Sequence, residues 1–328
     1  MADRGAGLIA TLIGAFALTS VAMAQTSPAR YPDRPITLVI PFTPGGSTDT
    51  TGRMFAHKLT EKLGQSVVVE YKPGANTMIG GAHLARSKPD GYTFMLGTGQ
   101  TAVTNAYLYR KVPYDTEKDI DVISMVTQVP LVAQVSDSSP IGDLDGLIAA
   151  AKAQPGQLTY GTIGLGSTGH LAIELLKVRA GINLINVPYK GSAGMQTDLR
   201  GGQLHLALDA PATVLPLVQA GRAKAIAITT ATRTVSMPNV PTMNERYPGI
   251  VAVGWWGFMA PTGLPPEVRT KLKSAIDSVL TDREITAFLE RAGMFPSTPM
   301  TEAQIGAFIR EERERYGPLI KGLGLQLE

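Results

Sequence analysis

A strand that runs into a loop of glycine, serine and threonine and then into a helix occurs twice in this chain, and this repetition limits the possible folds. The first copy is an apolar run at 36–42 followed by "TPGGSTDTTGR" (43–53). The second is "LTYGTI" (158–163) followed by "GLGSTGH" (164–170). Strands and helices alternate after both loops, which is typical of parallel α/β sheets. The sequence therefore predicts an α/β protein with two such units.

Hydrophobic spacing places the other elements. Ser47 is expected to cap the first helix, because Phe55, Leu59 and Leu63 then share one face and Gly64 ends it. Further strands are predicted at 66–74, 89–98, 182–190, 204–210 and 223–229, and further helices at 79–85, 144–156, 171–181 and 195–202. An apolar stretch at 119–136 connects the two units. The tail is expected to form three helices with solvent-facing charges, at 266–280, 282–293 and 302–324.

The first 24 residues are typical of a cleaved signal peptide. Arg4 precedes an apolar run at 7–21, and Ala22 and Ala24 put small residues at the positions that a signal peptidase reads. We expect cleavage after Ala24, because the run is short for a membrane span. The chain contains no cysteine, which excludes a lipid anchor and thiol chemistry. A soluble exported protein without a lipid anchor is therefore expected.

Common catalytic and cofactor motifs are not supported. "GLGSTG" matches the dinucleotide pattern G-x-G-x-x-G, but the next strand ends at 186–190 without the acid that would hold a ribose. Neither loop has the lysine of a P-loop or the G-x-S-x-G of a hydrolase. His170 is expected to be structural, and the four histidines lack metal-ligand spacing, so neither metal nor cofactor is expected. A net charge of +3 without basic clusters gives no reason to expect nucleic-acid binding.

Both loops share a property that favours binding an anion. A helix N-terminus presents unpaired N–H groups and about half a positive charge. Glycines let a ligand approach the backbone closely, and hydroxyls add donors. Because each α/β unit contributes one loop, we expect the two loops to face a common cleft and to hold a carboxylate. No nucleophile with a base is evident, so the sequence favours capture and release over chemistry.

The order of the motifs resembles that of the Bug family, the periplasmic solute receptors of tripartite tricarboxylate transporters. The matching segments are "YPDRPITLVIPFTPGGSTDTTGR", "VVVEYKPGA", "KPDGYTFMLGT", "YGTIGLGSTGHLAIELLK" and "GWWGFMAPTGLPPEV", and the resemblance extends from about Arg30 to the end. It implies a two-lobed periplasmic-binding-protein fold of type II, with a sheet flanked by helices in each lobe and two crossover segments. Lobe 1 is expected to comprise 30–127 and 251–328, and lobe 2 to comprise 128–250.

The resemblance also implies where the ligand binds. The family's pocket uses the first strand-to-helix loop and its counterpart in the second lobe. By this correspondence Gly46, Ser47 and Thr48 bind one carboxylate, and Gly166, Ser167 and Thr168 hold the opposite end of the ligand. The remaining candidates are Phe42 and Thr43 in the cleft wall, Asp49 as a loop brace, Thr98 and Gln100 after the third strand, and Asp209 and Ala210 after a strand of lobe 2.

The function implied by the resemblance is that of a receptor without enzymatic activity. Its ligand would be a small carboxylate, such as a di- or tricarboxylate, an acidic amino acid or an aromatic acid. Integral-membrane permease subunits would be its partners, and a monomer is expected. Two other functions stay open: ligand sensing for a signalling partner, and an exported hydrolase that uses Ser47 or Ser167.

Three loop positions depart from the family's pattern. Asn76-Thr77 replaces a glycine-rich turn after "KPGA", Ala106 stands where proline is usual, and Gly194-Met195 stands where Pro-Ala is common. Since loop side chains shape the floor of a cleft, the sequence does not specify which carboxylate is bound.

Overall fold

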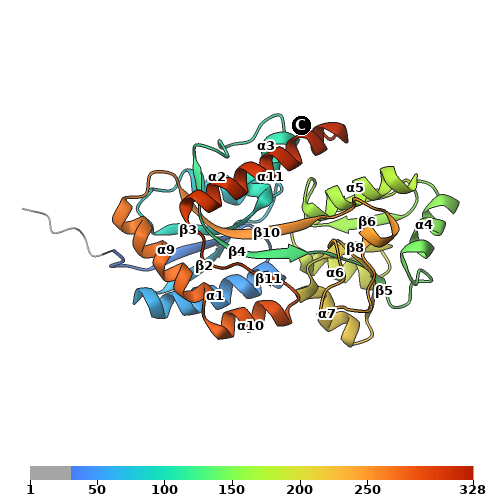
Figure 1. The fold of residues 1–328 in the computed structure, drawn as a ribbon, viewed down its shortest axis with the longest axis horizontal. Coiled ribbons are helices and arrows are strands. Elements are labelled where there is room, and N and C mark those ends of the chain that lie inside the picture. The colour runs from blue at the N-terminus through green and yellow to red at the C-terminus, as the bar shows by residue number, and fades with distance from the viewer. Residues whose placement is uncertain (1–30, 328) are drawn as a thin grey trace, which may run out of the picture. The chain divides into compact units, whose positions relative to one another are not determined.

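Apolar strands gathered into two separate sheets form the framework of the protein (Figure 1). The computed structural model describes residues 31–327, so the predicted signal peptide lies outside the described residues. From Pro32 onward the chain forms one unit, and its elements make two lobes, one around each sheet.

The sheet of lobe 1 is mixed, with the strand order β11-β4-β10-β3-β1-β2. Its strands are β1 (Ile36–Ile40), β2 (Val67–Tyr71), β3 (Thr93–Thr98), β4 (Ile120–Pro130), β10 (Val253–Pro261) and β11 (Phe295–Pro296). β1 pairs in parallel with β2 and β3, which confirms the parallel order predicted for the first unit. β10 runs antiparallel to both β3 and β4. The C-terminal part of the chain therefore completes a sheet that the N-terminal part begins.

Helices cover both faces of this sheet because its strands are apolar on both sides. They are α1 (Ser47–Leu63), α2 (Met78–Ala85), α3 (Asn105–Leu108), α9 (Pro266–Leu280), α10 (Arg283–Arg291) and α11 (Glu302–Gly322), with a π-helical turn at Gln100–Thr104. On one face Phe55 of α1 packs against Phe258 of β10, with ring centroids 5.2 Å apart. On the other face α2 and α11 pack around Val39 and Met95. Between residues 31 and 327, no helix combines the length and the apolarity that crossing a membrane requires.

The sheet of lobe 2 has the strand order β7-β6-β8-β5-β9. Its elements are β5 (Val132–Ser136), α4 (Leu144–Ala153), β6 (Thr159–Thr162), α5 (Thr168–Ala180), β7 (Ile185–Pro188), α6 (Ser192–Arg200), β8 (Leu206–Asp209), α7 (Pro211–Gln219), β9 (Ala223–Ile228) and α8 (Met243–Arg246). β6 pairs in parallel with β7 and β8, whereas β5 runs antiparallel to β8 and β9. The second predicted α/β unit is therefore present, and it too is extended by an antiparallel strand.

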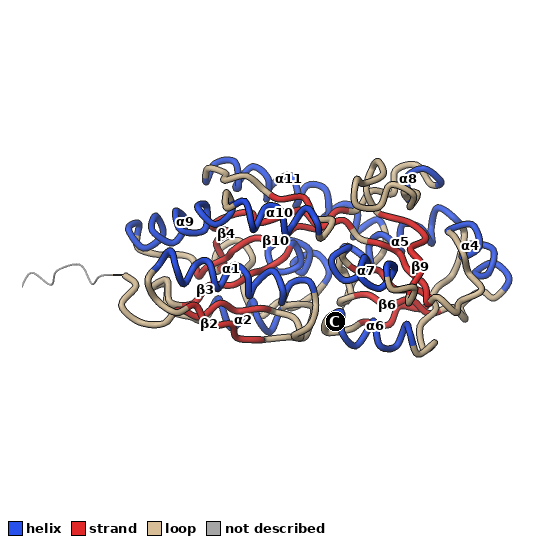
Figure 2. The backbone as a smooth tube through the Cα atoms, turned by 90° about the horizontal axis from the view of Figure 1, so that it is seen from below, coloured by secondary structure: helices blue, strands red, loops and turns tan. Residues whose placement is uncertain are grey.

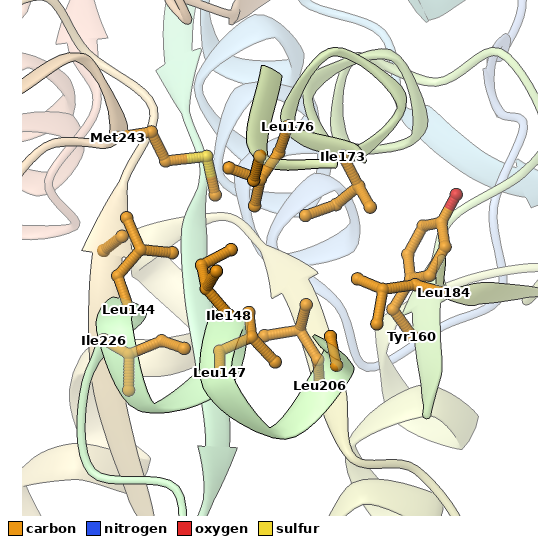
Figure 3. Packing of buried hydrophobic residues seen from close by; sticks show 14 of the residues in the cluster. Leu144, Leu147, Ile148, Tyr160, Ile173, Leu176, Leu184, Leu206, Ile226 and Met243 are labelled. Atoms are coloured by element: carbon orange, nitrogen blue, oxygen red, sulfur yellow. The ribbon is translucent and has the colours of Figure 1, made fainter. Parts of the chain in front are cut away.

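The core of lobe 2 fixes the position of α5, whose start contributes to the cleft. Leu147 and Ile148 of α4 and Ile173 and Leu176 of α5 point at the same face of the sheet (Figure 3). These side chains are almost fully buried, and truncating one such residue to alanine costs about 2–5 kcal/mol. The packing therefore holds the N-terminus of α5 at the carboxyl end of β6.

Two crossover segments connect the lobes and lie side by side. β4 and β10 run together toward lobe 2 in both views (Figure 1 and Figure 2). Where they leave the first sheet, Leu131 and Thr229 exchange hydrogen bonds: Leu131 N–H donates to Thr229 Oγ1 (2.9 Å), and Thr229 N–H donates to the Leu131 carbonyl (2.9 Å). Ala252 N–H donates to the Thr229 carbonyl (2.9 Å). These hydrogen bonds fasten both crossover segments to the end of β9 in lobe 2.

The structure corrects several local predictions. The three tail helices are confirmed, but Glu312 of α11 does not face solvent, because it is buried beneath a tryptophan to which it is hydrogen-bonded. Ser47 is not the N-cap of α1: Gly46 takes that position in an extended conformation, and Ser47 is the first helical residue. The stretch at 119–136 is two strands that belong to different sheets, β4 and β5.

Candidate functional site

A small cavity lies between the two lobes. Its lining residues are Ser47, Thr98, Gly99, Gln100, Val129, Leu131, Ile163, Ser167, Thr168, Gly169, Asp209, Ala210, Gly254, Trp255 and Trp256. The cavity volume is about 40 Å³, which is room for a few water molecules. The cavity in this form is therefore too small for a ligand of several carbon atoms.

The N-terminus of α1 reaches this cavity with free donors. Gly45 turns the chain at φ +90°, and the N-cap residue Gly46 has no side chain that could bond to the helix. Between residues 31 and 327, no hydrogen bond uses the N–H groups of Ser47 and Thr48 or the Ser47 hydroxyl. These groups are available to an anion.

Asp49 braces the loop in front of α1. Its carboxylate accepts hydrogen bonds from Gly45 N–H (2.8 Å), Arg53 Nε (2.8 Å) and Tyr71 OH (2.7 Å). Burial raises the pKa of Asp49, but the hydrogen bonds from Tyr71, Gly45 and Arg53 outweigh it and hold the pKa below its ordinary value. The carboxylate is thus ionised at neutral pH, and its hydrogen bonds hold the loop in place.

The N-terminus of α5 reaches the cavity from lobe 2. Ser167 caps the helix: its hydroxyl oxygen accepts from His170 N–H (3.2 Å), which leaves its own O–H free to donate. Gly166 N–H donates to His170 Nδ1 (2.9 Å). The N–H groups of Thr168 and Gly169 have no partner in the described part of the chain, and both residues line the cavity.

His170 stabilises this helix start and does not act as a base. The residue is 4% exposed, and burial lowers its pKa against the opposing effect of Glu174. Because Nδ1 accepts the Gly166 N–H, the neutral ring carries its proton on Nε2, which lies 3.7 Å from Glu174 Oε1. Within residues 31–327, no hydrogen bond joins the hydroxyl of Ser47 or Ser167 to a histidine ring or a carboxylate. Neither serine therefore has the general base of a hydrolase.

One carboxylate belongs to the wall of the cavity. Asp209 ends β8, is 1% exposed, and accepts hydrogen bonds from Ser192 Oγ (2.9 Å), Gln196 Nε2 (2.9 Å) and Ala210 N–H (2.8 Å). Burial raises its pKa to about 6, although these hydrogen bonds lower it. Among the described residues, no lysine, arginine or histidine lines the cavity. Backbone and hydroxyl dipoles would therefore hold a bound anion.

Two tryptophans supply the apolar side of the cavity. Trp255 and Trp256 of β10 both line it, and they are the two tryptophans of the sequence. Trp255 Nε1 donates to Glu312 Oε2 (2.9 Å), and the Trp255 ring packs edge-on against Phe308 with centroids 5.6 Å apart. The position of Trp255 is thus fixed from lobe 1, and intrinsic fluorescence should report on the contents of the cavity.

The predicted site residues separate into three groups. Seven line the cavity: Ser47, Thr98, Gln100, Ser167, Thr168, Asp209 and Ala210. Phe42 lines a second chamber of the cleft. The other five, which line neither chamber, are Thr43, Gly46, Thr48, Asp49 and Gly166. The contacts of all these residues with a ligand stay a prediction.

Sequence reasoning missed the residues that reach the cavity from the crossover segments. Val129, Leu131 and Gly254 line it together with the tryptophans. The apolar stretch at 119–136 was a signal, but its pattern does not show that the chain changes sheets at Leu131. The π-helical turn that begins at Gln100 also has no signature in the sequence.

Comparison with known proteins gives consistent matches over nearly the whole chain. The family described as "Tripartite tricarboxylate transporter family receptor" matches residues 51–325. Protein BugT of Bordetella pertussis is 35% identical over 319 residues, which cover 97% of this chain and 98% of BugT.

Solved structures agree with this match. "R. palustris Rpa4515 with adipate" is 35% identical with a TM-score of 0.86, over 90% of this chain and 100% of that one. The periplasmic binding protein BugD is 30% identical with a TM-score of 0.86, over 90% of this chain and 100% of BugD. MatC from Rhodopseudomonas palustris, with bound malate, is 26% identical with a TM-score of 0.83, over 88% of this chain and 100% of MatC.

Proposed function

This chain belongs to the receptors of the tripartite tricarboxylate transporter family, the Bug family, and from this membership we propose that it captures a small carboxylate for a membrane transporter. The family consists of substrate-binding receptors, not enzymes. Its two-lobed α/β fold agrees with the fold of this chain.

One observation carries the proposal. Two helices from different lobes, α1 and α5, begin at the same cavity with unpaired N–H groups and free hydroxyls. Such a terminus is suited to an anion, and hydrogen bonds to a charged acceptor are stronger than those between neutral groups. The cavity offers no basic side chain among the described residues and contains the Asp209 carboxylate. This combination favours a singly charged carboxylate group over a doubly charged phosphate.

The ligand would be an acid with a short apolar part. Trp255 and Trp256 offer apolar surface to the carbon atoms of a ligand. Ser47 and Thr168, which lie in opposite lobes, offer hydrogen bonds to its polar ends. The relatives solved with adipate and with malate support a dicarboxylate as the ligand class. Acidic amino acids and aromatic acids remain in the set to be tested.

Capture would occur by closure of the lobes. Lobe 1 would comprise 30–127 and 251–328, lobe 2 would comprise 128–250, and rotation near residues 128 and 250 would bring α1 and α5 onto the ligand. Closure removes water from the hydrogen bonds and strengthens them. The monomeric receptor, exported to the periplasm and cleaved after Ala24, would then deliver its ligand to integral-membrane permease subunits.

We expect a carboxylate to raise the melting temperature of the mature protein and to change its tryptophan fluorescence, because the ligand binds only the folded state. The double variant Ser47→Ala with Ser167→Ala should lose roughly 100-fold in affinity, since two hydrogen bonds to a charged group contribute about 1.5 kcal/mol each. Thermal shift across mono-, di- and tricarboxylates, acidic amino acids and benzoate-type acids, followed by calorimetry, measures both effects.

Ser274→Ala with Ser278→Ala, on the exposed side of α9, is the matched control and should bind normally. Ser167→Ala also removes a helix cap, which costs about 1 kcal/mol of stability without ligand, so affinity is compared at a temperature where all variants are folded. A folded wild-type protein that responds to none of the acids would overturn the carboxylate assignment.

A further inference from the structure

The cleft contains a second chamber beside the cavity. Its volume is about 240 Å³. Its lining residues are Pro41, Phe42, Gly74, Ala75, Asn76, Thr77, Tyr109, Ile163, Gly164, Leu165, Pro188, Tyr189 and Lys190. Ile163 lines both spaces. The inner cavity and this outer chamber are therefore neighbours, and what lies between them decides how far a ligand can extend.

A hydrogen-bonded pair of amide side chains stands between the two spaces. Gln100 lines the inner cavity and Asn76 lines the outer chamber. Gln100 Nε2 donates to Asn76 Oδ1 and also, across the cleft, to the Ile163 carbonyl (3.3 Å). The pair thus extends from lobe 1 to the residue of lobe 2 that both spaces share.

Further hydrogen bonds make this pair rigid. Asn76 Nδ2 donates to Asn105 Oδ1 (2.7 Å), and Asn105 Nδ2 donates back to the Asn76 carbonyl (2.9 Å). On the other side, Thr98 Oγ1 donates to Gln100 Oε1 (3.1 Å). Every amide group of the pair is therefore engaged, and neither side chain can turn aside without breaking hydrogen bonds.

The backbone at Asn76 is strained. Ala75, Asn76 and Thr77 have φ values of 45°, 50° and 70°, the left-handed region that glycine adopts most readily. Such conformations persist only where the surrounding structure enforces them, and they cluster at functional sites. Glycine would adopt these φ values with less strain, so a simple turn would not require asparagine at position 76. The asparagine side chain is thus present at a conformational cost, and its contact with Gln100 is what the position gains.

We propose that the Gln100–Asn76 pair sets the maximum length of the ligand, so that the receptor takes short dicarboxylates and excludes those whose chain would extend into the outer chamber. This inference rests on the proposed function and specifies the substrate class of the same site. A short acid fills the inner cavity between α1 and α5 once the lobes adjust around it. A longer acid must displace the pair and break its hydrogen bonds.

The test is a length series of straight-chain dicarboxylates, from three to eight carbons, titrated into wild type and Asn76→Gly. Glycine tolerates φ +50° and removes the amide. Wild type should bind the short acids best and lose at least about tenfold at seven and eight carbons. In Asn76→Gly the long acids should gain about tenfold, the factor expected when two further methylene groups are buried. Gln100→Ala, which removes the other half of the pair, should shift the optimum in the same direction.

Asn239→Gly, an exposed site in lobe 2, is the matched control and should keep the wild-type length profile. Identical profiles for wild type and folded Asn76→Gly would overturn the length limit, as would a wild type that binds the eight-carbon acid as tightly as the four-carbon acid. In both cases the proposed function as a carboxylate receptor would still stand. Failure of every acid to bind folded wild type would instead overturn the proposed function, and the length limit with it.

Discussion

Replacing Gly166 by alanine should weaken ligand binding by roughly 10- to 100-fold while leaving the protein folded. Gly166 precedes α5 in lobe 2, and a Cβ atom there would overlap Leu108 Cδ1 of lobe 1. The Gly166 carbonyl also accepts a hydrogen bond from Thr104 Oγ1 across the same contact (3.4 Å). Since overpacking costs about 1–3 kcal/mol, the closed form is penalised, whereas lobes that have moved apart are not. Binding that requires closure should therefore be weakened.

A matched glycine separates this effect from backbone strain. Gly166 has φ +74°, so alanine there also carries a left-handed penalty of about 1–2 kcal/mol. Gly181, at the C-cap of the same helix, has φ +62° and nothing within 4 Å of its Cβ position. Gly181→Ala should lower the melting temperature to a similar extent and leave ligand affinity unchanged.

Thermal unfolding and calorimetric titration of both variants check this expectation. Equal affinity losses in Gly166→Ala and Gly181→Ala would show that strain in α5, not closure against Leu108, controls binding. Wild-type affinity in Gly166→Ala would show that the contact with Leu108 is absent from the ligand-bound form.

The elements that the sequence predicted well are those with local signals. The tail helix α9 was located from its own periodicity, and β1 and its neighbours from apolar runs ended by glycine or proline. By contrast, α7 was missed because it begins at Pro211 and contains Pro216, and proline interrupts the helical pattern. β10 was missed because its role depends on antiparallel pairing with β3 and β4, which are far away in the sequence.

The candidate site shows the same division between local and distant information. The two helix N-termini could be found from their glycines and hydroxyls. The resemblance also placed Asp209 among the site candidates, but its burial could not be predicted, because that burial results from α6 packing over the end of β8 through Ser192 and Gln196. The departure at Asn76 was visible in the sequence, but its contact with Gln100 depends on two loops that meet only in the folded chain.

Replacing Asp209 by asparagine should stabilise the protein at neutral pH by about 1–3 kcal/mol. Burial raises the pKa of Asp209 to about 6 from an ordinary 3.8, and each pKa unit corresponds to about 1.4 kcal/mol. Between roughly pH 4 and pH 6 the folded protein keeps a proton that the unfolded chain has released. Stability from this group therefore falls as pH rises through that window and reaches its lower level above pH 6.

Asparagine fits the hydrogen bonds around Asp209. Its oxygen can accept from Ser192 Oγ and Ala210 N–H as the carboxylate does. Its amide can donate to Gln196 once that side chain turns, because Gln196 Oε1 is buried without a partner among the described residues. The variant removes a negative charge from the wall of an anion-binding cavity, so affinity for a carboxylate should rise several-fold at pH 7.5.

The measurement is the free energy of unfolding of wild type and Asp209→Asn from pH 4.5 to pH 8, with ligand affinity at both ends. The difference between the two proteins should be largest at pH 7.5 and should fall to roughly a third of that value at pH 4.5. His170, whose pKa burial lowers, contributes a loss of stability as pH falls below about 6.5, but it is present in both proteins and cancels in the difference. Asp137→Asn changes the net charge equally at an exposed site of lobe 2, and as the matched control it should leave the ligand affinity at pH 7.5 unchanged. Parallel stability curves for wild type and Asp209→Asn would mean that Asp209 does not titrate in this range, and carboxylate binding would then be independent of its protonation.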